Sequence, residues 1–298
     1  MPKVLVIGDL MIDHYLWGSA NRISPEAPVQ VVDIDNESTV LGGAGNVVNN
    51  LRALGCNVGV ISAIGKDEAG SELKEMLNSI ETKSYLIEQK NRKTSKKSRI
   101  IASHSQVVRY DKESKEDITE ESCHAIFEEF KFIVEDYDIV LLSDYGKGVL
   151  TSKLTLNLIE YANSKNKRVL VDPKGDDYSK YFGAYLLTPN KKEAQEATKI
   201  DIKNNDSLLD ALQSLKQTAN LTIPLITLSE DGIAILDENN KIINKPTVAR
   251  EVYDVTGAGD TVLASLGYCL AQNLDIGKSL EFANLAAGVV VGKLGSAT

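Results

Sequence analysis

Residues 138–175 read DIVLLSDYGKGVLTSKLTLNLIEYANSKNKRVLVDPKG, and this stretch decides the fold class. Its first apolar run, 138–144, ends in the polar turn DYGKG, and residues 151–165 then repeat apolar side chains at helical spacing. A second apolar run, 168–172, ends in the polar turn DPKG. Because these runs are apolar on both faces, as buried parallel strands are, the stretch predicts a strand–helix–strand unit.

The same alternation of short apolar runs and helical patterns extends along the rest of the chain. Further strands are expected in Val-, Ile- and Leu-rich runs at 4–8, 58–65, 184–188 and 224–229. Further helices are expected at 45–55, 67–79, 119–135, 206–219, 258–271 and 276–292. Strands that alternate with helices predict an α/β fold, in which a doubly wound, mostly parallel sheet is flanked by helices and one domain covers residues 1–298.

Two stretches, about 15–35 and 90–111, interrupt this rhythm, because they alternate apolar and polar residues without an adjacent long helix. They contain segments such as VQVVDID and QVVRYD. We expect them to form a small antiparallel β lid that projects from the main domain. Such a lid would cover the site or pair with another subunit, so a homodimer is expected. An additional edge hairpin is the alternative interpretation.

Charge and cysteine content narrow the function classes. The net charge of -9 disfavours non-specific nucleic-acid binding, because neutralising phosphates requires a basic surface. The three cysteines form no Cys-x-x-Cys pair, which indicates reduced thiols rather than a disulfide framework or a thiolate zinc site. The first residues, MPKVLVIGDL, resemble neither a signal peptide nor a membrane span, so a cytoplasmic protein without a membrane partner is expected.

Polar, mostly glycine-bearing turns follow five of the expected strands at their carboxyl ends. These turns are GD at 8–9, DYGKG at 144–148, DPKG at 172–175, TPN at 188–190 and SEDG at 229–232. Ligands of open parallel sheets bind beyond the carboxyl ends of the strands. Such turns gathered at one edge therefore predict an active site there, in preference to ordinary loops.

The segment DVTGAGD, residues 254–260, stands directly before the apolar helix pattern TVLASLGYCLA. A helix N-terminus leaves backbone N–H groups unpaired and carries a partial positive charge, and glycines let a charged ligand approach those groups. The segment is therefore a candidate anion cradle with Asp260 in the first turn. The alternative is a tight turn in which Asp260 only caps the helix. The sequence contains neither a P-loop motif nor G-x-G-x-x-G after the first strand, which disfavours a P-loop protein and a dinucleotide-binding fold.

Three motifs resemble those of the ribokinase-like (PfkB) carbohydrate kinases. GGAGN at 42–46, followed by Gly55 and Gly65, is similar to the first signature of that family, and DVTGAGD is similar to the second. TPNKKE at 188–193 resembles the family's magnesium and phosphate motif. Val48 departs from the small residue usual in the first signature, which bears on local helix packing. The resemblance implies a ribokinase-like fold and a sugar kinase that uses ATP and Mg²⁺.

The resemblance also implies roles for the residues around the cradle. Asp260 would be the general base that takes the proton of the sugar hydroxyl. The anion hole for the transferred phosphoryl group would be formed by Gly257, Ala258 and Gly259. Mg²⁺ would be held through water by Asn190 and Glu193, although Glu193 could instead complement a helix dipole. The nucleotide would contact Ser229, Glu230, Gly232 and Asn284.

For the sugar, the resemblance implies contacts with Asp13, Gly42, Gly43, Asn46 and Asp144. The glycines would allow close approach, and a helix N-cap is the alternative role for Asn46. A phosphate on the sugar would require cations, for which the candidates are Arg109 and Lys174, with Lys147 and Arg22 as further ones; Arg109 suits bidentate phosphate contact. A monovalent cation, as in some relatives, would be bordered by Asp254, Thr256 and Gly295.

Within the family, GDLMIDHYLWGSANRISPEAPVQVV at 8–32, VVRYD, SDYGKGVL and DPKG are similar to the heptose 7-phosphate kinases. This similarity implies that D-glycero-β-D-manno-heptose 7-phosphate is phosphorylated at its anomeric hydroxyl, in the synthesis of the lipopolysaccharide core. It also implies either a stand-alone kinase or the kinase part of a longer protein with an adenylyltransferase domain. The alternatives are a kinase of this family for another sugar or sugar acid, a non-catalytic nucleotide or sugar sensor, and a nicotinamide dehydrogenase.

Overall fold

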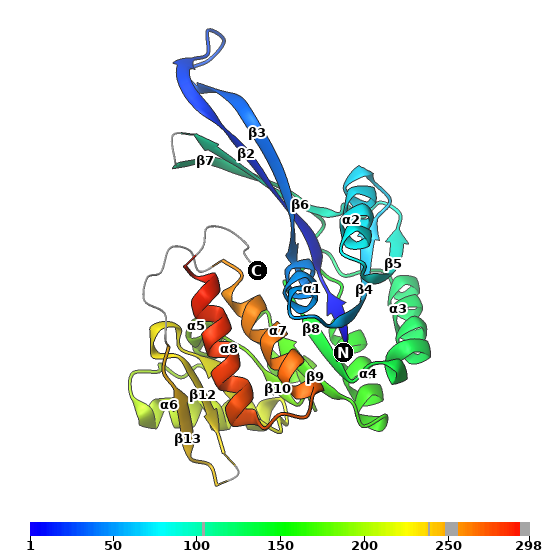
Figure 1. Ribbon diagram of the computed structural model, residues 1–298, viewed down its shortest axis with the longest axis vertical. Coiled ribbons are helices and arrows are strands. Elements are labelled where there is room, and N and C mark those ends of the chain that lie inside the picture. The colour runs from blue at the N-terminus through cyan, green and yellow to red at the C-terminus, as the bar shows by residue number, and fades with distance from the viewer. Residues whose placement is uncertain (103–104, 238, 248–255, 293–298) are drawn as a thin grey trace.

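A six-stranded sheet lies at the centre of the computed structural model, which describes residues 1–102, 105–237, 239–247 and 256–292 (Figure 1). Its strand order is β10-β9-β8-β1-β4-β5, with parallel pairings throughout. The strands are β1 Lys3–Gly8, β4 Asn57–Gly65, β5 Lys83–Gln89, β8 Ile139–Ser143, β9 Arg168–Asp172 and β10 Leu186–Leu187. The chain runs outward from β1 to β5 and then returns to β8. The sheet therefore switches direction between β1 and β8, where ligands of such sheets bind.

Helices cover both faces of this sheet, which confirms the doubly wound α/β fold. One face is covered by α1 Ala44–Ala53, α2 Glu68–Ser79, α7 Ala258–Ala271 and α8 Ile276–Val290. The other is covered by α3 Glu120–Ile133, α4 Ser152–Ser164, α5 Lys191–Thr198 and α6 Asn205–Thr218. Alternate residues of β1 serve the two cores: Val4 and Val6 pack into the first, whereas Leu5 and Ile7 pack into the second. Both faces of β1 are therefore apolar because each face packs into a hydrophobic core.

A four-stranded sheet projects from the carboxyl edge of the central sheet and forms the lid (Figure 1). Its strands, in the order β3-β2-β6-β7, are β3 Gln30–Gly43, β2 Leu10–Ile23, β6 Ser95–Ala102 and β7 Ser105–Lys112. The expected antiparallel pairing holds for β2 with β3 and for β6 with β7, but β2 and β6 run parallel. The reason is that β2 continues from β1 and β6 follows β5, so both leave the parallel sheet at the same edge and in the same direction.

A smaller antiparallel sheet, which the sequence patterns do not predict as such, extends the fold beyond β10. It consists of β11 Leu225–Thr227, β12 Ile233–Leu236 and β13 Ile242–Lys245. An isolated parallel bridge between Asn190 and Thr227 connects it to the end of β10. This bridge brings the SEDG turn to the same edge as the other polar turns. Among the described helices, none has the length and apolar character needed to cross a membrane.

Candidate active site

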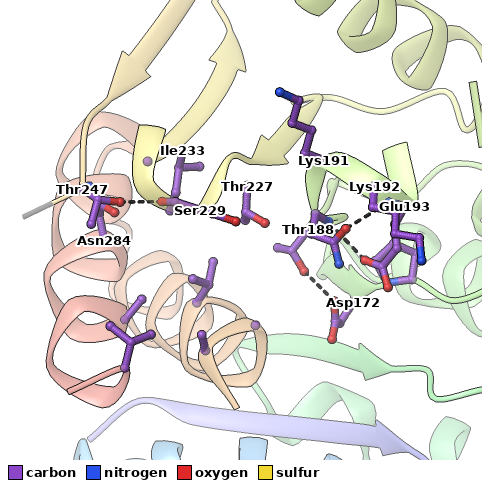
Figure 2. A pocket seen from close by; sticks show the side chains of 18 of the residues that line it. Asp172, Thr188, Lys191, Lys192, Glu193, Thr227, Ser229, Ile233, Thr247 and Asn284 are labelled. Carbon is purple, nitrogen blue, oxygen red and sulfur yellow. Dashed lines mark hydrogen bonds between the residues drawn. The ribbon is translucent and has the colours of Figure 1, made fainter. Parts of the chain in front are cut away.

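Four of the five predicted polar turns converge on a cleft of about 910 Å³ at the carboxyl edge of the central sheet. The turns after β8, β9, β10 and β11 line it, together with the first turn of α7 and one side of α8. Figure 2 shows Asp172 and Glu193 on one side of the cleft and Ser229 and Asn284 on the other. The cleft therefore brings together residues that follow strands of the central sheet and of the small antiparallel sheet, at the place predicted for a ligand.

Asp260 lies in the first turn of α7, beside Gly259, which lines the cleft. The Asp260 side chain is buried, and its two oxygens accept hydrogen bonds from Asn46 Nδ2 at 2.7 Å and from the Tyr145 hydroxyl at 2.7 Å. No side-chain hydrogen bond caps α7, so the alternative that Asp260 only caps the helix is wrong. Burial raises the pKa of Asp260 to about 6, although the bonds from Asn46 and Tyr145 oppose the shift. A carboxyl with that pKa is ionised at neutral pH and can accept a proton.

The backbone at the start of α7 has the geometry of an open cradle. Gly257 is the N-cap residue with φ +80°, a left-handed conformation that disfavours residues with a side chain. A Cβ added to Gly259 would find its nearest neighbour, Asp172 Oδ2, 3.9 Å away. Among the described residues, the space beside Gly259 is therefore open, and Ala258 and Gly259 both line the cleft.

Asn46 lies inside α1, which begins two residues earlier at Ala44 and has Gly43 as its N-cap residue. The N-cap role considered for Asn46 is therefore wrong. Its amide instead connects α1 to the Asp260 carboxylate across 214 positions of sequence.

Gly42 and Gly43 are packed closely against other atoms of the protein. A Cβ on Gly42 would lie 2.3 Å from Asp13 Oδ2, and a Cβ on Gly43, whose φ is +56°, would lie 2.5 Å from the Asp9 carbonyl oxygen. The absence of side chains at these two positions therefore leaves room for Asp13 and for the end of β1, and the contact of their backbone with the sugar stays a prediction. The buried Asp13 carboxylate also pairs with Arg99 of β6, with 2.7 Å between Oδ1 and the guanidinium.

Asn190 and Glu193 form a capping box at the start of α5. The Asn190 side chain accepts from the Glu193 N–H at 3.0 Å, and the Glu193 carboxylate accepts from the Asn190 N–H at 3.1 Å. The second Glu193 oxygen accepts from Lys174 Nζ at 3.0 Å. The helix-terminal role considered for Glu193 is thus present, and both residues also line the cleft.

The charges around this capping box suit a hydrated divalent cation. Asp172 is buried, and its pKa is raised well above its usual range by burial and by the neighbouring charges of Asp260 and Glu193. A cation near Asp172 would offset the charges of Asp260 and Glu193. Across the described ranges, no three His, Cys, Asp or Glu side chains are arranged to ligate a metal directly. Because Mg²⁺ keeps several of its waters, the residues present fit contact through water.

The residues predicted for the nucleotide lie together at the far side of the cleft. Ser229, Glu230 and Gly232 form the turn between β11 and β12, and Gly232 has φ +91° with no room for a Cβ beside the Lys245 carbonyl. Asn284 of α8 donates to the carbonyl oxygens of Lys245 and Pro246 at 3.1 and 2.5 Å. Asn284 therefore fixes this wall of the cleft through its side chain.

The basic side chains predicted to bind the sugar phosphate lie in different parts of the molecule. Lys174 lines the cleft beside Glu193, whereas Arg109 lies on β7 of the lid and pairs with both oxygens of Asp111 at 3.0 Å. Of the two further candidates, Lys147 pairs with Glu113, and Arg22 pairs with Asp33 near the outer end of β2.

Asp144 lines the cleft, but protein groups surround its carboxylate. It accepts from the Gly146 N–H at 2.8 Å, from Lys180 Nζ at 2.6 Å and from the Tyr181 hydroxyl at 2.8 Å. Asp144 therefore orders the turn after β8. For the predicted monovalent-cation site, Asp254 and Gly295 lie outside the described residues, and Thr256 alone of the three is described.

Four site residues carry no predicted role: Asp9, Arg99, Tyr145 and Asp172. Asp9, Tyr145 and Asp172 stand in the polar turns GD, DYGKG and DPKG, so their position at the strand ends was a usable signal. Arg99 had no such signal, because only the pairing of β6 with β2 brings it beside Asp13.

Comparison with known proteins places these observations in a family. The family model described as pfkB family carbohydrate kinase matches residues 1–298. The proteins named "Bifunctional protein HldE" from Aliarcobacter butzleri (strain RM4018) and Sulfurimonas denitrificans (strain ATCC 33889 / DSM 1251) are 64% and 60% identical over 298 residues. The match covers all of this chain and 62% of the length of each of these relatives.

Solved structures of low sequence identity share the fold. Phosphofructokinase-2 from Escherichia coli, in its tetrameric inhibited form, superposes with a TM-score of 0.82 at 18% identity and covers 98% of this chain and 94% of its own. Arabidopsis thaliana ribokinase complexed with ribose and ATP superposes with a TM-score of 0.75 at 18% identity, covering 99% and 94%.

Proposed function

Because this chain belongs to the pfkB family of carbohydrate kinases, we propose that it transfers the γ-phosphoryl group of ATP to D-glycero-β-D-manno-heptose 7-phosphate. The acceptor is the anomeric hydroxyl, and the product is the 1,7-bisphosphate. The observation that carries the proposal is the buried Asp260 carboxylate beside an open helix N-terminus at the edge of a large cleft. The proposed domain is the whole chain, residues 1–298.

In this mechanism, Asp260 orients the sugar hydroxyl and accepts its proton as the oxygen–phosphorus bond forms. The N–H groups of Gly257, Ala258 and Gly259 face the charge that develops on the transferred phosphoryl group. Asn190 and Glu193 would hold Mg²⁺ through water, and the ion would supply charge neutralisation at the phosphates. Lys174, beside Glu193, is assigned here to the nucleotide phosphates rather than to the sugar phosphate, since it lines the cleft.

The sugar lies under the lid, on the face that carries Asp13. Strand register places Tyr15, Arg99 and Arg109 opposite one another on neighbouring strands, so their side chains share one face of the lid. Arg99 also lies over the Tyr15 ring, 5.2 Å from its centroid. A guanidinium pair on this face suits the distal phosphate of the sugar. The lid carries exposed apolar residues as well, including Val107, Val108 and Tyr110, which support the prediction of a homodimer.

The substrate is tested by ADP release with a panel of acceptors. We expect kcat/KM to be highest for heptose 7-phosphate, because Arg99 and Arg109 share a face of the lid with Asp13 and can exchange their carboxylate partners for its phosphate. Ribose, fructose 6-phosphate and ketodeoxygluconate are the comparison substrates for the alternative of another sugar kinase. Faster turnover of ribose than of heptose 7-phosphate would contradict the substrate assignment.

Replacing Arg99 with methionine is expected to raise KM for heptose 7-phosphate by about 10–100-fold, since a hydrogen bond to a charged group contributes about 1.5–3 kcal/mol. KM for ATP should stay nearly unchanged. Arg22→Met, near the outer end of β2, is the matched control and should leave both constants near the wild-type values. If R99M weakened unphosphorylated heptose by the same factor as the 7-phosphate, Arg99 would not be the phosphate ligand.

A further inference from the structure

We propose that Tyr145 is a positioning residue that fixes the Asp260 carboxylate for proton transfer, an inference that rests on the proposed kinase function. Tyr145 stands in the turn after β8, and its hydroxyl donates to Asp260 Oδ1 at 2.7 Å. Asn46 donates to the other oxygen, Oδ2, at 2.7 Å. With a donor on each oxygen, the carboxylate cannot rotate without losing a hydrogen bond. Each oxygen still keeps a lone pair for the sugar hydroxyl.

The backbone that carries Tyr145 is held by the buried carboxylate of Asp9, at the end of β1. Asp9 Oδ2 accepts from the N–H groups of Tyr145 at 2.8 Å and Lys147 at 3.0 Å, and Oδ1 accepts from the Val149 N–H at 3.1 Å. A carboxylate that binds three amides within the five residues 145–149 sets the path of the turn. The position of the Tyr145 ring is therefore fixed from the centre of the sheet.

The same turn is bonded to the base of the lid. Lys147 Nζ pairs with Glu113, the residue after β7, at 2.7 Å. Arg92, which precedes β6, donates to the carbonyl oxygens of Lys147 and Glu116. The turn that aims Tyr145 at Asp260 is thus attached to the segment that enters β6 and to the segment that leaves β7. The Tyr145 hydroxyl connects this turn to the Asp260 carboxylate.

Tyr145 acts on Asp260 chemically as well as sterically. Burial and the nearby charge of Asp260 raise the pKa of the Tyr145 phenol well above its usual range, so it remains an O–H donor. Two carboxylates from other elements act on this pair, Asp13 of β2 and Asp172 of β9. The charge of Asp13 favours protonation of Asp260, and the charges of both raise the pKa of Tyr145. Donation from Tyr145 and Asn46 opposes this effect and favours the ionised form, which is the form a general base needs.

The test is the pH profile of kcat/KM for Tyr145→Phe, which removes one oxygen atom. In the wild type, activity should be lost as the pH falls through about 6, when Asp260 becomes protonated. Removing a donor to the ionised form raises the pKa of Asp260, so the acidic limb of Y145F should move upward by about one pH unit. We also expect kcat to fall by about 10–100-fold, with KM for ATP changed by less than about threefold.

Tyr181→Phe is the matched control, because its hydroxyl also donates to a buried carboxylate, that of Asp144, at 2.8 Å, but does not contact Asp260. Its acidic limb should stay at the wild-type pH. Should Y145F not fold in a thermal melt, Tyr145→Met removes the donor in its place, and the same shift is expected. An unshifted limb with near-wild-type kcat would overturn the inference. A wild-type protein without sugar kinase activity would instead overturn the proposed function, so the two failures are distinguishable.

Discussion

Replacing Asp260 with asparagine is expected to lower kcat for phosphoryl transfer by about 10²–10⁴-fold, the usual contribution of general acid–base catalysis. Asparagine has the shape of aspartate but cannot accept the proton of the sugar hydroxyl. The residue lies at the end of the cleft beside the helix N-terminus, and its neighbours Asn46 and Tyr145 hold it from two other elements. The loss should therefore appear in kcat rather than in KM for ATP.

Folding and nucleotide binding are the controls for this variant. A thermal melt and calorimetric titration with an ATP analogue should place D260N near the wild type, with Kd for the nucleotide changed by less than about threefold. Asp210→Asn, an exposed residue of α6, makes the same change of charge far from the proposed chemistry and should keep full activity. Wild-type turnover by D260N would remove the general base from the mechanism, and it would revive the alternative of a nucleotide or sugar sensor.

Five of the six central strands could be predicted because each is a short run of apolar residues followed by a polar turn. The partly exposed edge strand β5 was missed, and the run at 224–229 belongs to the small antiparallel sheet as β11. The pattern at 258–271 predicts α7 with the bounds that the structure has. The polar turns at the strand ends likewise predict the location of the cleft, since parallel strands bring their carboxyl ends to one edge.

Elements without a local periodic signal were missed. Helix α5 reads KKEAQEAT and buries Ala194 alone, so it has no apolar stripe, and its start depends on the capping box of Asn190 and Glu193. Contacts between distant segments are equally hidden, since no spacing indicates that Asn46 reaches Asp260 across 214 positions. Local spacing suggested an N-cap for Asn46, and the actual contact became visible only when α1 and α7 were packed together.

The lid shows why residue roles are harder to predict than the location of a site. The sequence does not reveal that the space beside Gly42 is occupied by Asp13, whose carboxylate is held in turn by Arg99. The register between β2 and β6 decides which cations share a face with Asp13, and this register follows from the parallel departure of two strands from the central sheet. A one-residue shift would have turned Arg99 to the opposite face.

Replacing Gly259 with alanine is expected to leave the fold stable and to reduce kcat/KM by about 100-fold or more, comparable with the loss of one anion-hole donor. Alanine favours a helix over glycine by about 0.5–1 kcal/mol, and among the described residues outside α7 the added Cβ would have Asp172 Oδ2, at 3.9 Å, as its nearest neighbour. The unfolding temperature should therefore stay equal or rise.

G259A is expected to lose activity because the added methyl group would occupy the space beside the start of α7. In the proposed mechanism the transferred phosphoryl group must approach the N–H groups at the start of α7, and a methyl group at position 259 would stand in its way. Gly277→Ala is a close control, because Gly277 is the second residue of α8 as Gly259 is the second residue of α7, and Gly277 does not line the cleft. G277A should keep its activity. If G259A were more stable than the wild type and also fully active, the phosphoryl group would have to bind elsewhere. The extra methyl group lowers activity only when a ligand must occupy that space.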